Sequence, residues 1–318
     1  MRNSFRERPL LTHRIVSLIP SATEIVCALG FADQLVARSH ECDYPAEVAR
    51  LPACTAPKFD PDGTSYQIDQ RVKAILQEAL SVYRVDAHLL NQVEPSLIVT
   101  QSQCEVCAVS LRDVERAACE LIGSQPQIVS LAPESLASIA TDIQLVADAL
   151  DAPDRGRSLV DRMRQRLKRL RDAAANSTRR PRVACIEWIE PLMAAGNWMP
   201  ELVEIAGGIN VLGEAGKRSK WITFEDLSAV DPDVIFISPC GFGIGRTMVD
   251  IPVLKNQPQW KNLKAVSSGR VYVADGNQYF NRPGPRIVDS AEILAEILYP
   301  QLFNFSARDK WWLQLLDD

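Results

Sequence analysis

The chain has 318 residues, of which 47% are hydrophobic and 24% are charged, and its formal net charge is −5. This length favours two domains, and the composition is that of an ordinary globular protein. The negative charge argues against nucleic acid as the main partner, and no apolar run approaches the roughly 20 residues of a membrane span.

An N-terminal extension, residues 1–13, is charged and lacks the apolar stretch of a secretory signal. Eight cysteines in a chain without such a signal are typical of reduced thiols in a cytosol. The sequence therefore predicts a cytoplasmic protein, or a periplasmic one if the true start lies further upstream.

Strands and helices alternate through residues 14–150, and this pattern predicts an N-terminal α/β lobe. Ser21 and Glu24 have the spacing of a capping box, for a helix that ends at Gly30. Residues 51–66 are rich in Pro, Asp and Gly and predict a surface loop. The other predicted elements are strands at 14–18, 34–39, 97–100 and 128–131, extended chain at 83–86, and helices at 86–93, before 122 and at 135–150.

Residues 151–180 predict a connecting helix. One narrow apolar stripe recurs there at helical spacing, and nearly all other side chains are charged. Twenty-odd helical residues span roughly 35 Å, the width of a small domain. We interpret this segment as a rigid connection between two lobes, and its arginines as a solvated face. The stripe consists of Leu159, Val160, Met163, Leu167, Leu170 and Ala174.

The alternation restarts in residues 181–303, which predict a C-terminal α/β lobe. Thr223 and Asp226 have the spacing of a capping box. A tail, residues 304–318, carries an aromatic patch that we expect to pack on a lobe. The other predicted elements are strands at 182–189, 234–237 and 270–274 and helices at 200–207 and 286–298.

Two segments of nine residues, 90–98 and 227–235, share Leu, Val and Pro at the same offsets before a strand. This similarity, with the shared order of elements, indicates a structural repeat. Ligands of open parallel sheets bind beyond the carboxyl ends of the strands. We therefore expect the two lobes to face each other and their strand-end loops to line one cleft.

The predicted strand-end loops are rich in aromatic and polar side chains. An aromatic residue in a loop as often packs the loop down as it contacts a ligand, but the group suits a large, flat, partly apolar ligand. The candidate ligand-binding residues are Ser21, Tyr44, Gln101, Trp188, Asn197, Trp198, Trp221, Phe242, Asn277, Tyr279, Phe280 and Arg282.

Cys104 and Cys107 follow a predicted strand and open a helix, a position that favours the thiolate. They could form a reactive dithiol or, together with Cys42, Cys240 and His40, supply ligands to a soft metal ion. Buried, unreactive thiols explain the same residues. A thiol- or metal-dependent enzyme on this scaffold is therefore the alternative function.

The order of several motifs resembles a known family. These motifs are residues 17–24 (SLIPSATE), 43–45 (DYP), 94–99 (EPSLIV) and 201–210 (ELVEIAGGIN), with the connecting helix between the third and fourth. The order is similar to that of the helical-backbone (class III) periplasmic substrate-binding proteins, and within them to the vitamin B12 (cobalamin)-binding proteins of ABC importers. The resemblance covers roughly residues 14–300.

The resemblance implies a clamshell of two Rossmann-like three-layer α/β lobes joined by one long helix, the chelatase-like, helical-backbone metal receptor fold, with little hinge motion. It implies a non-catalytic protein that holds cobalamin or another corrinoid, or less readily a ferric siderophore or haem. By position, Tyr44, Trp188 and Tyr279 or Phe280 would contact this tetrapyrrole-like ligand.

The resemblance also implies docking on an ABC permease through an acidic residue on each lobe. Glu204 matches the acidic position of the C-terminal lobe, whereas the corresponding N-terminal position is His88. A scaffold protein without a ligand is a third reading of the sequence. It would be favoured if Trp198 and Tyr279 packed away from any cavity.

Overall fold

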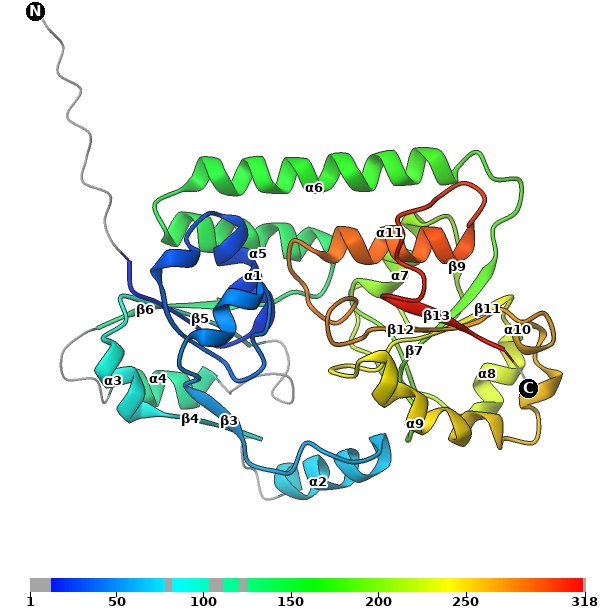
Figure 1. The fold of residues 1–318 in the computed structure, drawn as a ribbon, viewed down its shortest axis with the longest axis horizontal. Helices are drawn as coiled ribbons and strands as arrows, with labels where there is room; N and C mark the ends of the chain where they lie inside the picture. Colours follow the sequence, from blue (N-terminus) through cyan, green and yellow to red (C-terminus); the bar gives the residue numbers. More distant parts are fainter. Residues whose placement is uncertain (1–12, 78–81, 103–110, 120–124, 317–318) are drawn as a thin grey trace, which may run out of the picture.

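The computed structural model describes residues 13–77, 82–102, 111–119 and 125–316. Two α/β lobes lie side by side, and one long helix, α6 (Pro153–Ala174), runs along an edge of both (Figure 1). The predicted fold of two lobes joined by a helix is confirmed. Within the described residues, no helix is both long and apolar enough to cross a membrane.

The N-terminal lobe contains a parallel sheet with the strand order β2-β1-β5-β6. Ile15 of β1 pairs with Leu35 of β2 on one side and with Leu97 of β5 on the other. The strands are β1 (Ile15–Ser17), β2 (Leu35–Arg38), β5 (Leu97–Gln101) and β6 (Gln127–Leu131). The helices are α1 (Pro20–Ala28), α3 (Ala87–Val93), α4 (Leu111–Cys119) and α5 (Leu136–Ala149), with short 3₁₀ turns at Ala32–Gln34 and Ala46–Arg50.

Alternating strand residues explain the three layers of this lobe, because successive side chains of a strand point to opposite faces. Ile15 and Leu97 pack in the cluster that contains side chains of α1 and α5. Val16 and Ile98 pack in a second cluster, with Leu90 of α3. Helices therefore cover both faces of the sheet.

A two-stranded ribbon, β3 (Thr55–Pro57) paired antiparallel with β4 (Tyr83–Val85), carries α2 (Ser65–Gln77) away from this lobe (Figure 1). The prediction of a surface loop at 51–66 is therefore wrong in part. Ser65, Ile68 and Asp69 of α2 are buried and Val72 and Ile75 are partly buried, so the helix has only a narrow apolar stripe on an otherwise polar surface.

The C-terminal lobe contains a mixed sheet with the order β10-β8-β7-β11-β12-β13, and β9 pairs with β7. The tail contributes β13, which pairs antiparallel with β12. The strands are β7 (Arg182–Trp188), β8 (Met193–Ala194), β9 (Ile209–Asn210), β10 (Lys220–Trp221), β11 (Val234–Ile237), β12 (Val271–Ala274) and β13 (Trp312–Leu315). The helices are α7 (Met199–Ile205), α8 (Phe224–Val230), α9 (Ile244–Lys255), α10 (Lys264–Ser267) and α11 (Ile287–Leu298), with a 3₁₀ turn at Trp260–Asn262.

Helix α6 packs on α5 of one lobe and on α7 and α11 of the other. Its predicted apolar stripe is confirmed, since Leu159, Met163 and Leu170 are buried and Leu167 is partly buried against the same cluster. This cluster continues through both lobes, so α6 belongs to a shared core and is more than a linker.

The predicted repeat is also confirmed at the level of the backbone. Helix α3 leads to β5 and α8 leads to β11, each through a turn that contains proline. Glu94 ends α3 with φ 40°, and Asp231 ends α8 with φ 36°, so both turns begin with a residue in the left-handed region. The two segments are therefore equivalent helix-turn-strand units.

Candidate functional site

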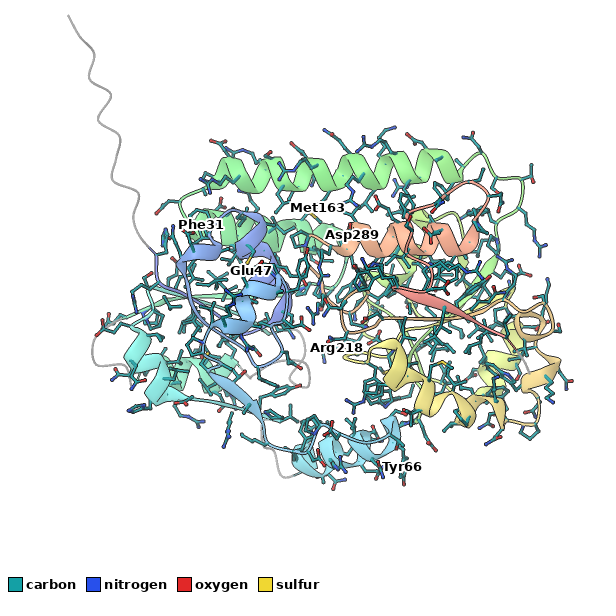
Figure 2. All side chains as sticks on the ribbon, viewed as in Figure 1. Phe31, Glu47, Tyr66, Met163, Arg218 and Asp289 are labelled. Carbon is teal, nitrogen blue, oxygen red and sulfur yellow. The ribbon has the colours of Figure 1, made fainter. Side chains whose placement is uncertain are left out.

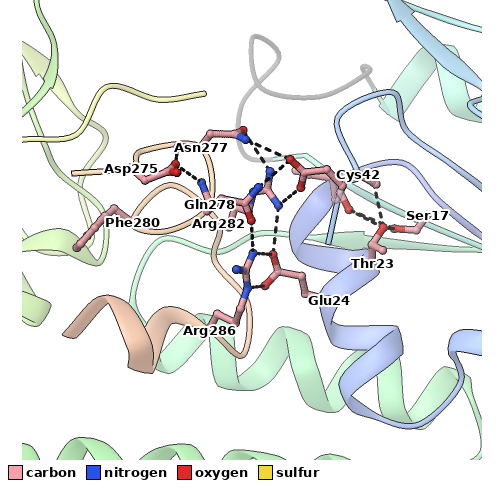
Figure 3. A network of polar contacts seen from close by, with 12 residues as sticks. Ser17, Thr23, Glu24, Cys42, Asp275, Asn277, Gln278, Phe280, Arg282 and Arg286 are labelled. Carbon is pink, nitrogen blue, oxygen red and sulfur yellow. Dashed lines mark hydrogen bonds and ion pairs between the residues drawn. The ribbon is translucent and has the colours of Figure 1, made fainter. Parts of the chain in front are cut away.

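The loops that follow β2 and β12 meet between the lobes. Asp43 accepts hydrogen bonds from Arg282 Nη1 at 2.6 Å and from Gln278 Nε2 at 2.8 Å, and Asn277 Nδ2 lies 3.2 Å from the same carboxylate (Figure 3). Burial alone would raise the pKa of Asp43, but the hydrogen bond and charge of Arg282 hold that pKa below its ordinary value. The carboxyl ends of the two sheets therefore face each other, as the sequence predicts.

Glu24 of α1 is only 3% exposed and lies against two arginines of the opposite lobe (Figure 3). Arg286 contacts it twice, with Nη2 2.5 Å from Oε1 and Nε 3.0 Å from Oε2, while Arg282 Nη1 lies 3.4 Å from Oε1. The capping-box prediction is wrong, because α1 begins at Pro20 and no side chain caps it. The Glu24 carboxylate instead pairs with Arg286 and, together with Asp43, compensates the charges of Arg282 and Arg286.

Two tyrosines flank Arg286. Its guanidinium carbon lies 3.6 Å from the ring centre of Tyr44 and 5.1 Å from that of Tyr279. Tyr44 is 43% exposed, whereas Tyr279 is buried and packs edge-on against Trp311. Of these two predicted contact residues, Tyr44 is therefore the one with surface left for a ligand.

Trp188 ends β7, and its ring centre lies 5.0 Å from that of Phe242 in the loop after β11. Arg246 covers the Phe242 ring at 4.1 Å. Trp188 Nε1 is buried and has no hydrogen-bond partner among the described residues. An unsatisfied indole N–H at the edge of the sheet is a donor that a bound molecule could use.

Trp221 of β10 lies at the edge of the C-terminal lobe and is 55% exposed. The ammonium group of Lys73, on α2, lies 5.5 Å from its ring centre. The structure thus places Trp221 beside helix α2 of the opposite lobe.

Three predicted ligand contacts stabilise the C-terminal lobe itself. Trp198 is buried and donates from Nε1 to the carbonyl oxygen of Phe280 at 2.7 Å. Phe280 is fully buried against Phe236. The backbone N–H of Asn197 donates to the carbonyl oxygen of Lys217 at 2.6 Å. Trp198 and Phe280 offer almost no surface to a ligand in this arrangement.

Ser21 and Gln101 lie at the inter-lobe side of the N-terminal sheet and are both buried. Ser21 Oγ finds no hydrogen-bond partner within the described part of the chain. Gln101 is the last residue of β5. Like the other predicted contacts, these two remain predictions.

Three of the candidate metal ligands, His40, Cys42 and Cys240, lie within the described residues. Cys42 is buried and its Sγ accepts a hydrogen bond from Thr23 Oγ1 at 3.0 Å, while burial raises the pKa of its thiol to about 11. His40 Nδ1 lies 2.8 Å from Thr55 Oγ1, and burial, with the charge of Arg38, lowers its pKa to about 4. These groups have the properties of an unreactive thiol and a neutral, hydrogen-bonded imidazole.

Cys104 and Cys107 lie outside the described residues, and Cys240 is half-buried. Among the residues that the structure describes, no three His, Cys, Asp or Glu side chains lie close enough to hold a metal ion. His40, Cys42 and Cys240 therefore do not form a metal site by themselves. A soft-metal site that includes Cys104 and Cys107 stays a prediction.

Glu204, the predicted docking residue, is half-exposed on α7 and forms an ion pair with Arg180. His88 is exposed on α3. Both positions are accessible, and docking through them stays a prediction.

Sequence reasoning missed the residues that join the lobes. The sequence predicts Glu24 as part of a helix cap, Asp43 only as part of a loop that lines the cleft, and Arg286 as the start of a helix, with no role for any of them in joining the lobes. Glu24 and Arg286 are 262 positions apart, and no local pattern connects them.

The sequence matches the family described as "Periplasmic binding protein" over residues 15–277. It is 26% identical to the vitamin B12-binding protein of Vibrio cholerae over 291 residues, which are 91% of this chain and 90% of that protein. It is 22% identical to an uncharacterized ABC transporter substrate-binding lipoprotein of Bacillus subtilis, covering 92% of this chain and 81% of the relative. The structure superimposes on a periplasmic heme binding protein from Pseudomonas aeruginosa with a TM-score of 0.68 and 22% identity, covering 92% and 94% of the two chains.

The comparisons overturn two expectations drawn from the sequence. The cytoplasmic location is wrong, because the matched family is one of periplasmic binding proteins and the Bacillus relative is a lipoprotein. The alternative of a thiol- or metal-dependent enzyme also falls, because these relatives are substrate-binding proteins. The chain belongs to the periplasmic binding protein family, and it is a binding protein and not an enzyme.

Proposed function

We propose that this protein binds a metal-containing tetrapyrrole, a corrinoid such as cobalamin, between its two lobes. The observation that carries the proposal is the indole of Trp188 at the carboxyl end of β7, which packs on the buried Phe242 ring and whose N–H has no hydrogen-bond partner among the described residues. Large ligand sites combine apolar and aromatic walls with a few polar groups that fix orientation. The similarity of nine-tenths of the chain to a vitamin B12-binding protein supports the corrinoid in particular.

Haem is the competing ligand, because a periplasmic heme binding protein has the same fold. Haem iron takes a protein ligand such as His, Cys, Met or Tyr. Tyr44 is an exposed inter-lobe side chain of that kind, 43% exposed, and the guanidinium group of Arg286 lies 3.6 Å from its ring centre. Any binding test must therefore include haemin as well as cobalamin.

The direct test is an absorbance titration of the purified protein with cyanocobalamin and, separately, with haemin. We expect a saturable shift of the cobalamin spectrum at micromolar or tighter affinity. Trp188→Ala should weaken binding at least about tenfold, since a buried aromatic contact is commonly worth 2 kcal/mol or more.

Phe305→Ala is the matched control, because Phe305 is an exposed aromatic that stacks on Phe303. It should bind like the wild type. Binding of haemin alone would replace the corrinoid by haem. Binding of neither ligand would refute the proposal and favour a scaffold, the reading with which the packing of Trp198 and Tyr279 agrees.

We further infer that an ABC permease is the protein partner, as the family and the name of the Bacillus relative suggest. Glu204 is the predicted contact. Its ion pair with Arg180 would have to be released or shared on docking.

A further inference from the structure

The ribbon β3–β4 and helix α2, here called the arm, extend from the N-terminal lobe to the C-terminal lobe. Pro57 pairs with Tyr83 at the end of the ribbon, and the N–H of Lys58 donates to Val82 just beyond it. In Figure 1, α2 lies along the edge of the molecule opposite α6. Figure 2 shows Tyr66, in the first turn of α2, beside the C-terminal lobe. The arm therefore spans the two lobes on the side away from the connecting helix.

The first turn of α2 binds a carboxylate of the opposite lobe. Asp250 of α9 is 1% exposed, and its Oδ2 accepts a hydrogen bond from the backbone N–H of Ser65 at 2.8 Å. The backbone N–H of Glu190, at the end of β7, donates to Ser65 Oγ at 3.1 Å. A negative charge at the N-terminus of a helix is favourable because of the helix dipole and the unpaired N–H groups there.

A cationic side chain of α9 holds the segment just before α2. The guanidinium group of Arg246 donates to the carbonyl oxygens of Pro61 and Gly63, the latter at 3.3 Å. With the Asp250–Ser65 contact, these bonds form what we call the latch. Beyond the latch, α2 buries Ile68 and Asp69, and its Val72 and Ile75 pack partly buried against the apolar cluster of its own lobe. The contacts named above between α2 and the C-terminal lobe are polar.

The opposite side of the inter-lobe region is held more firmly. There Glu24 binds Arg282 and Arg286 in a buried network, and α6 shares a continuous core with both lobes. Opening the lobes on that side would break buried ion pairs, whereas releasing the arm would break a few polar bonds at its tip. The arm is therefore the part that costs least to displace.

We propose that the arm opens as a unit about the β3–β4 ribbon and that the latch controls the exchange of ligand between the lobes. The control of ligand exchange rests on the proposed function. The opening of the arm does not, because it depends only on the arm's contacts with α9 and with the turn after β7.

The experiment compares amide hydrogen exchange and ligand dissociation in the wild type and in two latch variants of the full chain. Asp250→Ala removes the acceptor, and Ser65→Pro removes the donor while keeping a residue suited to the first position of a helix. Loss of one charge-assisted hydrogen bond should make exchange in residues 66–77 about tenfold faster. Amides of β5, β11 and α6 should keep their wild-type rates. Bound cobalamin, or haemin if that is the ligand, should dissociate about tenfold faster.

Asp226→Ala is the matched control, because Asp226 is also a carboxylate at a helix N-terminus but caps α8 of its own lobe. It should leave the arm unchanged. The proposal would be overturned if amide exchange in residues 66–77 were unchanged in both latch variants, or if amide exchange in β11 were accelerated equally. It would also be overturned if amide exchange in the arm became faster while the ligand dissociated at its wild-type rate. If neither cobalamin nor haemin binds the wild type, the proposed function fails, and amide exchange alone decides whether the arm opens.

Discussion

Glu24 is a buried carboxylate that compensates the charge of Arg286 and shares Arg282 with Asp43. Removing one partner of a buried ion pair typically costs 3–5 kcal/mol, since the other charge is left without compensation. We expect Glu24→Gln to lower the free energy of unfolding by about 3 kcal/mol. Urea denaturation followed by circular dichroism measures this change.

The control for Glu24 is an exposed ion pair. Asp154→Asn removes the partner of Arg157 on the outer surface of α6, where both side chains are largely solvated. Exposed pairs contribute about 1 kcal/mol or less, so this variant should unfold almost like the wild type. Equal losses in the two variants would show that the Glu24 network does not hold the lobes together.

His40 should make stability depend on pH. Its pKa is about 4 in the folded protein, against an ordinary value of 6.5, because burial and the charge of Arg38 disfavour the imidazolium. Between these values the unfolded chain binds a proton that the folded protein excludes. The contribution of His40 is therefore complete above pH 6.5 and is lost as the pH falls towards 4.

The measurement for His40 is the difference in unfolding free energy between the wild type and His40→Asn across this pH range. The comparison is needed because neighbouring Glu41 acts in the opposite direction. Burial raises the pKa of Glu41 to about 7, so its contribution is lost as the pH rises from 4.5 to 7. Parallel pH profiles for the wild type and His40→Asn would contradict the assignment.

At the scale of elements, the two repeat turns allow a paired prediction. Glu94 is exposed and has a left-handed backbone that glycine adopts more readily, so Glu94→Gly should stabilise the protein by about 0.5–1 kcal/mol. Asp231→Gly should not, because Asp231 Oδ1 also accepts a hydrogen bond from the N–H of Lys264 at 2.8 Å. Thermal unfolding of both variants measures the difference, and equal stabilisation would refute this account of the second turn.

Elements with a local signal could be predicted from the sequence. The stripe of α6 and the capping box of Thr223 and Asp226 are confirmed, because each depends on residues a few positions apart. Helix α9 was not predicted. Pro252 lies inside it, and the glycine-rich segment that precedes it gave no recognisable start signal. Helix α2 was missed because its side chains are mostly exposed.

The site could be predicted only in outline. Loop position predicts Tyr44, Trp188 and Arg282 as ligand contacts, and Tyr44 and Arg282 lie where the loops of the two lobes meet, while their contact with a ligand stays a prediction. It could not separate Trp188, with its unsatisfied N–H, from Trp198, whose N–H is satisfied by Phe280. That distinction depends on packing between residues that are distant in the sequence.

At the scale of the whole molecule, the lobes are joined by the shared core of α6, the Glu24 network and the latch of the arm. We therefore expect ligand binding to leave the arrangement of the lobes nearly unchanged, with a backbone shift of about 1 Å or less. Small-angle scattering with and without ligand should give the same radius of gyration. A clear contraction on binding would show that the lobes close as hinged bodies.

The most direct test of the account is a crystal structure of the protein with the tetrapyrrole that binds it. We predict that the macrocycle lies between the lobes, with Trp188 Nε1 donating to it and with Tyr44 at its face or edge. A macrocycle bound on the outer surface of either lobe, with the Trp188 indole still unpaired, would contradict the central claim.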